Sequence, residues 1–295
     1  MTDEELDIVR TAFARQMLAV AGVADNAPLE MAFRTVRRED FLGTEPWKII
    51  DFTRAMADLP SNDPIYAYQD VLFVLSAGRG VNNGGPSLHA RLLNALSPKA
   101  GETVVHLGAG TGYYTAILAH LVGPQGRVIA VEIDEALAQK ARAVLSHIPN
   151  VEVVVDDAAA WLGEAADCIY VNFAVLAPWD RWIDRLAPGG RLVFPLGVPG
   201  KPLRPAGPRF SRHGAAFLIE RMTTGFSASH ICPAYFVHAE GQASKSDAAE
   251  QERLQDAFRR SGAEFVRSLV WQRPAALERC WVCTPQWGLC YDPVE

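Results

Sequence analysis

The sequence predicts an α/β fold with a doubly wound, mostly parallel sheet of about seven strands. From residue 103 onward, apolar runs of strand type alternate with segments of helical periodicity, which is the pattern of a parallel sheet covered by helices. A glycine-rich turn follows the first of these runs, as in nucleotide-binding crevices. The predicted strands are 103–107, 127–131, 151–155, 167–171 and 191–195, and two later ones, at 216–222 and 234–239, are expected to be antiparallel.

Helices and a broken segment precede this region. Thr2 and Glu5 form a predicted capping box that opens the first helix. A second helix is predicted over residues 29–36, and Pro86 stands where a third would begin. Prolines interrupt residues 43–68, which we predict to be loop and short helix, suited to a lid.

The part of the chain after the predicted sheet is irregular at first. Residues 197–214 are rich in Pro, Gly and Arg and are predicted to be an exposed loop, and residues 241–246 to be a linker. A helix over 247–260, a strand around 265–271 and a hairpin over 280–291 are expected to form a small α+β extension.

The glycine-rich turn favours one class of cofactor. Gly108, Gly110 and Gly112 follow a strand, and Glu132 ends the next strand about 20 residues later. A dinucleotide fold would place a third glycine at position 113, where this chain has Tyr113. The spacing G-x-G-x-G favours S-adenosylmethionine, which has no pyrophosphate to bind at a helix N-terminus.

Composition excludes several classes of function. The chain has 295 residues, 49% of them hydrophobic and 21% charged, as in a soluble globular protein. Its net charge of -6 argues against nucleic acid as a partner. It has no apolar run long enough for a membrane span and no signal peptide at residues 1–5, so cytoplasmic residence is expected.

The cysteines predict thiols rather than a metal site. Five cysteines is an odd number, which suits a reducing compartment. Cys280 and Cys283 form a C-x-x-C with Cys290 nearby, but a zinc site would need a fourth ligand. We therefore expect two strands joined by residues 284–288, and no metal.

Several segments together resemble the protein-L-isoaspartate O-methyltransferase family. They occur in the family's order and cover about residues 28–240. Arg37 stands at the proline of the first segment. The resembling segments are 31–41 (V-P-R-E-x-F), 67–70 (A-Y-x-D), 86–90 (P-x-x-H-A), the glycine turn with Glu132 and Asp157, and 186–193.

The resemblance implies an S-adenosylmethionine-dependent methyltransferase with a Rossmann-like core. Glu132 would bind the ribose, Asp157 would lie near the adenine, and His89 near the methionine end. Each has a plainer reading: a helix-start acid for Glu132, a solvated loop acid for Asp157 and a half-buried helix residue for His89. The implied cofactor residues are His89, His106, Gly108, Ala109, Gly110, Thr111, Gly112, Glu132, Ile133, Asp157 and Ala158.

The acceptor loop departs from the family, which has G-Q-T-I-S-x-P where this chain has residues 78–86. We expect the acceptor to be a carboxylate of a small molecule or peptide, which is ionised at neutral pH and needs no base. Arg79, Asn82, Asn83 and His89 are the catalytic candidates, with Arg79 binding the carboxylate in bidentate fashion. The plainer reading is a solvated arginine and two turn-forming asparagines.

Other functions remain open on the sequence alone. A small-molecule O- or N-methyltransferase would use His89 or His106 as a base. A nicotinamide oxidoreductase is disfavoured by Tyr113. A non-catalytic binding protein could keep the same fold. The expected organisation is a helical, lid and acceptor-loop region at 1–97, the cofactor-binding core at 98–240 and the extension at 241–295.

Overall fold

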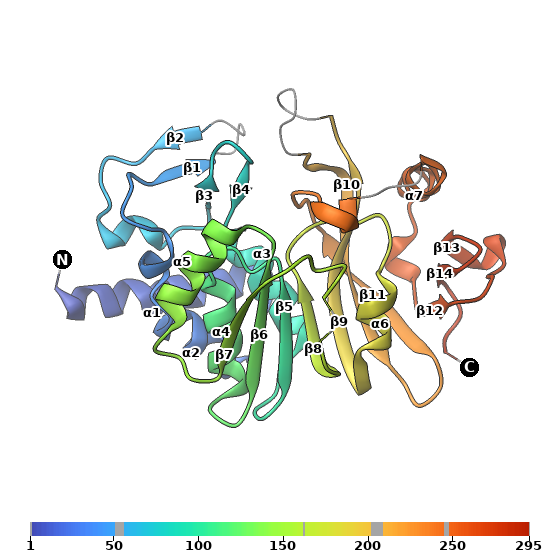
Figure 1. Ribbon diagram of the computed structural model, residues 1–295, viewed down its shortest axis with the longest axis horizontal. Coiled ribbons are helices and arrows are strands. Elements are labelled where there is room, and N and C mark those ends of the chain that lie inside the picture. The colour runs from blue at the N-terminus through green and yellow to red at the C-terminus, as the bar shows by residue number, and fades with distance from the viewer. Residues whose placement is uncertain (1, 51–55, 162, 202–208, 245–247, 295) are drawn as a thin grey trace. The chain divides into compact units, whose positions relative to one another are not determined.

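The computed structural model (Figure 1) forms two compact units. The first unit comprises residues 1–102 and 109–155, and the second comprises residues 103–108 and 156–295. The residues that the structure describes are 2–50, 56–161, 163–201, 209–244 and 248–294.

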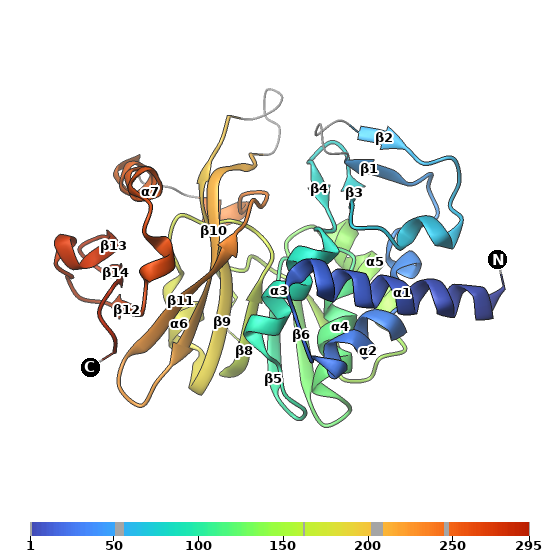
Figure 2. The same cartoon turned by 180° about the vertical axis from the view of Figure 1, so that it is seen from behind.

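The first unit contains the N-terminal helices, of which α1 packs against α2 and α3 (Figure 2). The predicted capping box is present, because the Thr2 hydroxyl accepts the N–H of Glu5 while the Glu5 carboxylate accepts the N–H of Thr2. The helices are α1 (Asp3–Ala21), α2 (Ala27–Thr35), α3 (Pro86–Leu96), α4 (Tyr113–Val122) and α5 (Glu135–Leu145), with 3-10 turns η1 (Arg38–Phe41) and η2 (Pro64–Ala67).

A small antiparallel sheet in the first unit has the order β2-β1-β3-β4 (Figure 1). Its strands are β1 (Lys48–Ile50), β2 (Met56–Asp58), β3 (Leu72–Ser76) and β4 (Val81–Asn82). The prediction of loop and short helix over 43–68 is therefore wrong for β1 and β2. These strands are short and half exposed, so they lack the alternating pattern that would reveal them.

The remaining strands of the first unit are a parallel pair, β6 (Arg127–Glu132) and β7 (Val151–Val155). Helix α5 connects them. Asp134 caps this helix, and Leu137, Ala141 and Leu145 are buried, as the periodicity predicts.

The second unit is built on one sheet, with the order β13-β14-β12-β11-β10-β9-β8-β5. Strands β5, β8 and β9 run parallel to one another. From β9 onward through β10, β11, β12, β14 and β13, each strand is antiparallel to its neighbour. The strands are β5 (Thr103–Leu107), β8 (Ala166–Val171), β9 (Leu186–Pro199), β10 (Ser211–Arg221), β11 (Phe226–Pro233), β12 (Ser268–Trp271), β13 (Cys280–Cys283) and β14 (Trp287–Cys290). The other elements are α6 (Asp180–Asp184), α7 (Ala248–Arg260) and the 3-10 turns η3 (Gly241–Ser244), η4 (Ala263–Phe265) and η5 (Leu277–Arg279). The C-terminal extension thus continues the sheet of this unit.

Two predictions in the second unit are wrong. The expected loop over 197–214 begins and ends in paired strands, with Gly197 opposite Gly214, and residues 202–208 lie outside the described part. Glycine is needed at 197 because a Cβ there would lie 2.5 Å from Ser211 Oγ. The strand expected at 234–239 lies earlier, at β11, because pairing with β10 rather than local sequence fixes it.

The C-terminal hairpin is confirmed, but its cysteines are not all thiols. A disulfide joins Cys280 and Cys290, whereas Cys168, Cys232 and Cys283 are thiols. The expectation of reduced cysteines is therefore wrong for one pair, because the register places its members opposite each other. The expected linker at 241–246 contains the 3-10 turn η3, with residues 245 and 246 outside the described part. Among the described residues, no helix has the length and apolar character needed to cross a membrane.

Candidate functional site

The glycine turn of the first unit has a backbone that only glycine adopts readily. Gly110 has a φ of 58° and Gly112 a φ of 95°. A Cβ on Gly112 would also lie 2.6 Å from Cδ1 of Leu145 in α5. The N–H of Ala109 donates to the carbonyl of Val131 at 3.2 Å, which anchors the turn to β6. The turn is thus shaped by conformation and by close packing.

Glu132 ends β6 and holds the turn through its carboxylate. One carboxylate oxygen accepts the N–H of Gly110 at 2.7 Å, and the other accepts the N–H of Asp134 at 2.9 Å. Only 7% of Glu132 is exposed. Burial raises the pKa of this carboxyl, and the two backbone hydrogen bonds act in the opposite direction. An ionised carboxylate accepts about four hydrogen bonds, so it has room for two more.

A shallow hollow of about 460 Å³ lies beside the end of β6. Ile133 is 40% exposed there, an unusual position for a large apolar side chain directly after a buried strand. Asp134 caps α5 by accepting the N–H of Leu137 at 3.0 Å. The hollow is lined by Arg79, Ile133, Asp134, Glu135, Ala136 and Gln139.

The acceptor-loop candidates lie on the β3–β4 hairpin of the first unit. Arg79 forms an ion pair with Asp134, so it is not the solvated loop charge of the plainer reading. Asn82 accepts the N–H of Gly84 at 2.9 Å through its side chain, which makes a local turn. The side chain of Asn83 is buried and accepts the N–H of Phe73 at 2.8 Å. Both asparagines therefore support the hairpin, and their catalytic role stays a prediction.

His89 is a buried residue of α3. Its ring stacks on Tyr114 with centroids 3.7 Å apart and an interplanar angle of 11°. It also lies against Gly84, where a Cβ would be 2.0 Å from Nε2 of the histidine. Gly84 has a φ of 73°, so both its conformation and this contact require glycine. His89 is 1% exposed, so it is buried more deeply than the plainer interpretation expects, and its role stays a prediction.

In the second unit, His106 is a neutral buried residue. Its Nε2 lies 2.7 Å from the amide nitrogen of Asn172, which donates to it when the ring is neutral. Burial lowers the pKa of His106 to about 3. Gly108 has a φ of 78°, and a Cβ there would lie 2.7 Å from the ring of Phe173.

Asp157 is held by two backbone amides of the second unit. Its carboxylate accepts the N–H of Ala159 at 2.9 Å and the N–H of Gln242 at 2.7 Å. The carbonyl of the adjacent Ala158 accepts the indole N–H of Trp182 at 2.9 Å. The sequence indicated Asp157 and Ala158 but not Gln242, because the latter comes 85 residues later in a segment that resembles a linker.

Comparison with known proteins identifies the family. A model of the family described as "Protein-L-isoaspartate(D-aspartate) O-methyltransferase (PCMT)" matches residues 17–203, more than half of the chain. The chain belongs to this family. Members of the family are S-adenosylmethionine-dependent methyltransferases.

Individual relatives agree with this assignment. The chain is 40% identical over 156 residues to the protein-L-isoaspartate O-methyltransferase of Aeropyrum pernix, a match over 49% of this chain and 59% of that protein. It therefore spans about three fifths of this relative's length. A protein-L-isoaspartate O-methyltransferase structure matches with a TM-score of 0.62 at 22% identity, over 90% of this chain and 74% of the other. A putative one from Plasmodium falciparum, in complex with S-adenosyl-L-homocysteine, matches with a TM-score of 0.57 at 17% identity, over 78% and 98%. These two likenesses support the α/β fold.

Two family segments have a structural role that the sequence did not reveal. Arg38, in the segment resembling V-P-R-E-x-F, is fully buried and donates to the carbonyls of Ala67, Gln69 and Val71 at 2.8, 2.7 and 2.9 Å. Asp70, between two of these carbonyls, accepts the N–H and hydroxyl of Ser87 at 3.1 and 2.5 Å. Arg38 therefore fixes the A-Y-x-D segment, and that segment fixes the first turn of α3, which carries His89. In the sequence, this contact could have been suspected only from the joint presence of Arg38-Glu39 and the later A-Y-x-D segment.

Proposed function

We propose that this chain binds S-adenosylmethionine and methylates a carboxylate of a small molecule or peptide. The observation that carries the proposal is the buried Glu132 carboxylate at the end of β6. One of its oxygens accepts a hydrogen bond from the glycine turn, and the other accepts one from the residue that caps α5. Its remaining acceptor sites suit the two hydroxyls of a ribose. Bound S-adenosylmethionine would supply a methyl group activated by the sulfonium.

The other cofactor contacts are proposed residue by residue. The positive φ angles of Gly108, Gly110 and Gly112 suit close approach of a ligand to the main chain. The exposed Ile133 offers apolar surface for an adenine ring. The remaining assignments follow the family resemblance: His106, Ala109 and Thr111 belong to the turn, Asp157 and Ala158 would contact the adenine, and His89 would contact the methionine end.

A carboxylate acceptor fits the state of the histidines better than an amine or phenol does. An amine or phenol would need a general base with a pKa near neutral. Burial lowers the pKa of His106 to about 3, and its Nε2 already accepts from Asn172. His89 is stacked on Tyr114 and buried. A carboxylate has a solution pKa of about 4 and is ionised without a base.

Arg79 is the residue proposed to bind the acceptor. Its side chain is 37% exposed and its guanidinium pairs with the carboxylate of Asp134, whose side chain is 15% exposed. An acceptor carboxylate has the same chemistry as Asp134 and would replace it in this pair. Asn82 and Asn83 then act by holding the hairpin that carries Arg79.

The test is a methyl-transfer screen with radiolabelled S-adenosylmethionine. Isoaspartyl peptides, peptide C-termini and small carboxylic acids are offered to the wild type and to Glu132→Ala. We expect an alkali-labile methyl ester on at least one carboxylate, strong reduction in the variant, and little ester on isoaspartyl peptides because the acceptor loop differs. Alkali-stable methylation of an amine would contradict the proposed acceptor. Binding of S-adenosylhomocysteine without any transfer would favour a non-catalytic binding protein.

A further inference from the structure

Three cysteines lie on one face of the β13–β14 hairpin. In a regular strand, residues three apart point to opposite faces, which would separate Cys280 from Cys283. A register shift between Cys280 and Val282 changes this, so that Cys280 pairs with Cys290 and Cys283 pairs with Gly288. Because 288 and 290 are two apart on β14, all three cysteine side chains share a face.

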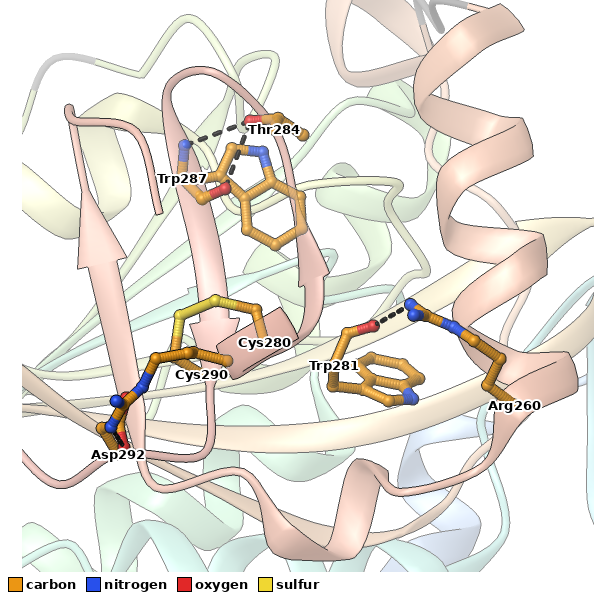
Figure 3. Close-up of a disulfide and its surroundings, with 8 residues drawn as sticks. Arg260, Cys280, Trp281, Thr284, Trp287, Cys290 and Asp292 are labelled. Carbon is orange, nitrogen blue, oxygen red and sulfur yellow. Dashed lines mark hydrogen bonds and ion pairs between the residues drawn. A yellow bond between two sulfur atoms is a disulfide. The ribbon is translucent and has the colours of Figure 1, made fainter. Parts of the chain in front are cut away.

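Gly288 brings Cys283 close to the disulfide. The disulfide joins Cys280 to Cys290 (Figure 3), and Cys283 is a half-buried thiol. A Cβ built on Gly288 would lie 3.0 Å from Cβ of Cys283, 3.2 Å from Cβ of Ala275 and 3.4 Å from Sγ of Cys290. These short distances disfavour a side chain at 288, and glycine there lets Cys283 and Cys290 lie close together.

We propose that Cys280, Cys283 and Cys290 form a thiol–disulfide exchange site. The Cys283 thiolate attacks Sγ of Cys290, so that a Cys283–Cys290 bond forms while the Cys280–Cys290 bond breaks. Cys280 leaves as a thiolate and takes up a proton equivalent to the one that Cys283 lost. No electrons are gained or lost, so the exchange needs neither an oxidant nor a reductant. The site lies beyond residues 17–203, the part that the family model matches.

The position of β13 lets the exchange occur without loss of the hairpin. Within the described sheet β13 is the edge strand, with β14 as its neighbour. Trp281 anchors β13 to α7. Its carbonyl accepts from Arg260 at 2.7 Å (Figure 3), and its indole N–H donates to the carbonyl of Ala257 at 3.0 Å. The cysteines on either side of Trp281 can therefore rearrange about a fixed centre.

The charges around Cys283 set the conditions for the assay. Burial raises the pKa of this thiol, and Glu278 acts weakly in the same direction. Arg253 and Arg260 of α7 lower the pKa by smaller effects. The thiolate is the attacking species, so the exchange is measured at about pH 8.5 rather than at neutral pH.

The wild-type experiment uses the full chain oxidised with glutathione disulfide and then freed of glutathione. After incubation the thiols are blocked with N-ethylmaleimide in acid, and chymotrypsin cuts after Trp281 and Trp287, which separates the three cysteines. We expect both Cys280–Cys290 and Cys283–Cys290 bridges, each with the remaining thiol alkylated. A single Cys280–Cys290 bridge at all times, or three thiols after oxidation, would overturn the proposal.

Two variants test the route. Gly288→Ala places a Cβ within 3.4 Å of Cys283, Ala275 and Cys290, and Gly288 has no left-handed φ that would strain alanine. The added methyl group must push Cys283 and Cys290 apart, so we expect this variant to exchange about tenfold more slowly. An unchanged rate would contradict a direct attack of Cys283 on Cys290. Cys280→Ser leaves Cys283 and Cys290, which should bridge on oxidation. Two persistent thiols in that variant would contradict the exchange.

Discussion

The amide N–H of Gly110 donates to the carboxylate of Glu132 at 2.7 Å. This bond joins the bend of the glycine turn to the end of β6, so the shape of the turn depends on an acid 22 residues away. The same carboxylate accepts the N–H of Asp134. One side chain therefore sets the turn and the start of α5 together.

Replacing Glu132 should weaken cofactor binding. Glu132→Gln keeps one acceptor oxygen and nearly the same volume, but it loses the charge and one acceptor. A hydrogen bond to a charged group contributes about 1.5–3 kcal/mol, so we expect S-adenosylhomocysteine to bind about 10–100-fold more weakly. Titration calorimetry measures this, with Glu30→Gln, at a half-exposed side chain of α2 that pairs with Arg15, as a control that should bind like the wild type. Equal affinity of wild type and Glu132→Gln would show that the cofactor lies elsewhere.

Breaking the ion pair between Arg79 and Asp134 should strengthen binding of the acceptor carboxylate. Asp134→Asn keeps a capping side chain for α5, because asparagine is as good an N-cap as aspartate. It removes the charge that pairs with Arg79. A half-exposed ion pair is worth about 1 kcal/mol, so KM for the acceptor should fall about fivefold. Asp134→Ala is the matched control, since it also loses the cap and should lower the stability by about 1 kcal/mol. A raised KM in Asp134→Asn would contradict the exchange of carboxylates.

Removing the Arg38 guanidinium should destabilise the first unit. Arg38→Met fills similar volume but leaves the carbonyls of Ala67, Gln69 and Val71 without their donor. We expect the free energy of unfolding in urea to fall by about 3 kcal/mol or more. Arg37→Met is the control, because that side chain is half exposed and its ion pairs contribute under about 1 kcal/mol. If both substitutions lowered the free energy of unfolding equally, the hydrogen bonds of Arg38 would not be what stabilises this segment.

His106 should make the protein less stable in acid. Its folded pKa of about 3 lies below the ordinary value of 6.5, so the unfolded chain takes up a proton first as the pH falls. Its contribution is fully present above pH 6.5 and is lost between 6.5 and about 3, at about 1.4 kcal/mol per pH unit. Between pH 7 and pH 5, the free energy of unfolding should fall by about 2 kcal/mol less in His106→Gln than in the wild type. An unchanged slope would mean that His106 is protonated in the fold.

Local sequence patterns were sufficient to predict the elements of the fold that show a clear periodicity. Alternation of apolar runs and helical periodicity predicted β5, β6, β7 and β8 to within a residue at either end. The same reasoning failed at β1 and β11, where pairing with the neighbouring strands β2 and β10, rather than the composition of the segment itself, makes the strand. It also failed at residues 197–199, where glycine and proline suggested a loop and close strand packing requires glycine.

The sequence by itself determined the family, the α/β class, the glycine turn and the acid at the end of β6, because each depends on short motifs and on their order along the chain. The tertiary structure alone decided that Arg38 clamps the A-Y-x-D segment, that Gln242 donates to Asp157, and that a bulge brings Cys283 to the face of the disulfide. These contacts depend on segments far apart in the chain or on the register of two strands, and no local pattern specifies either. Burial and hydrogen bonding select them only once the chain has folded.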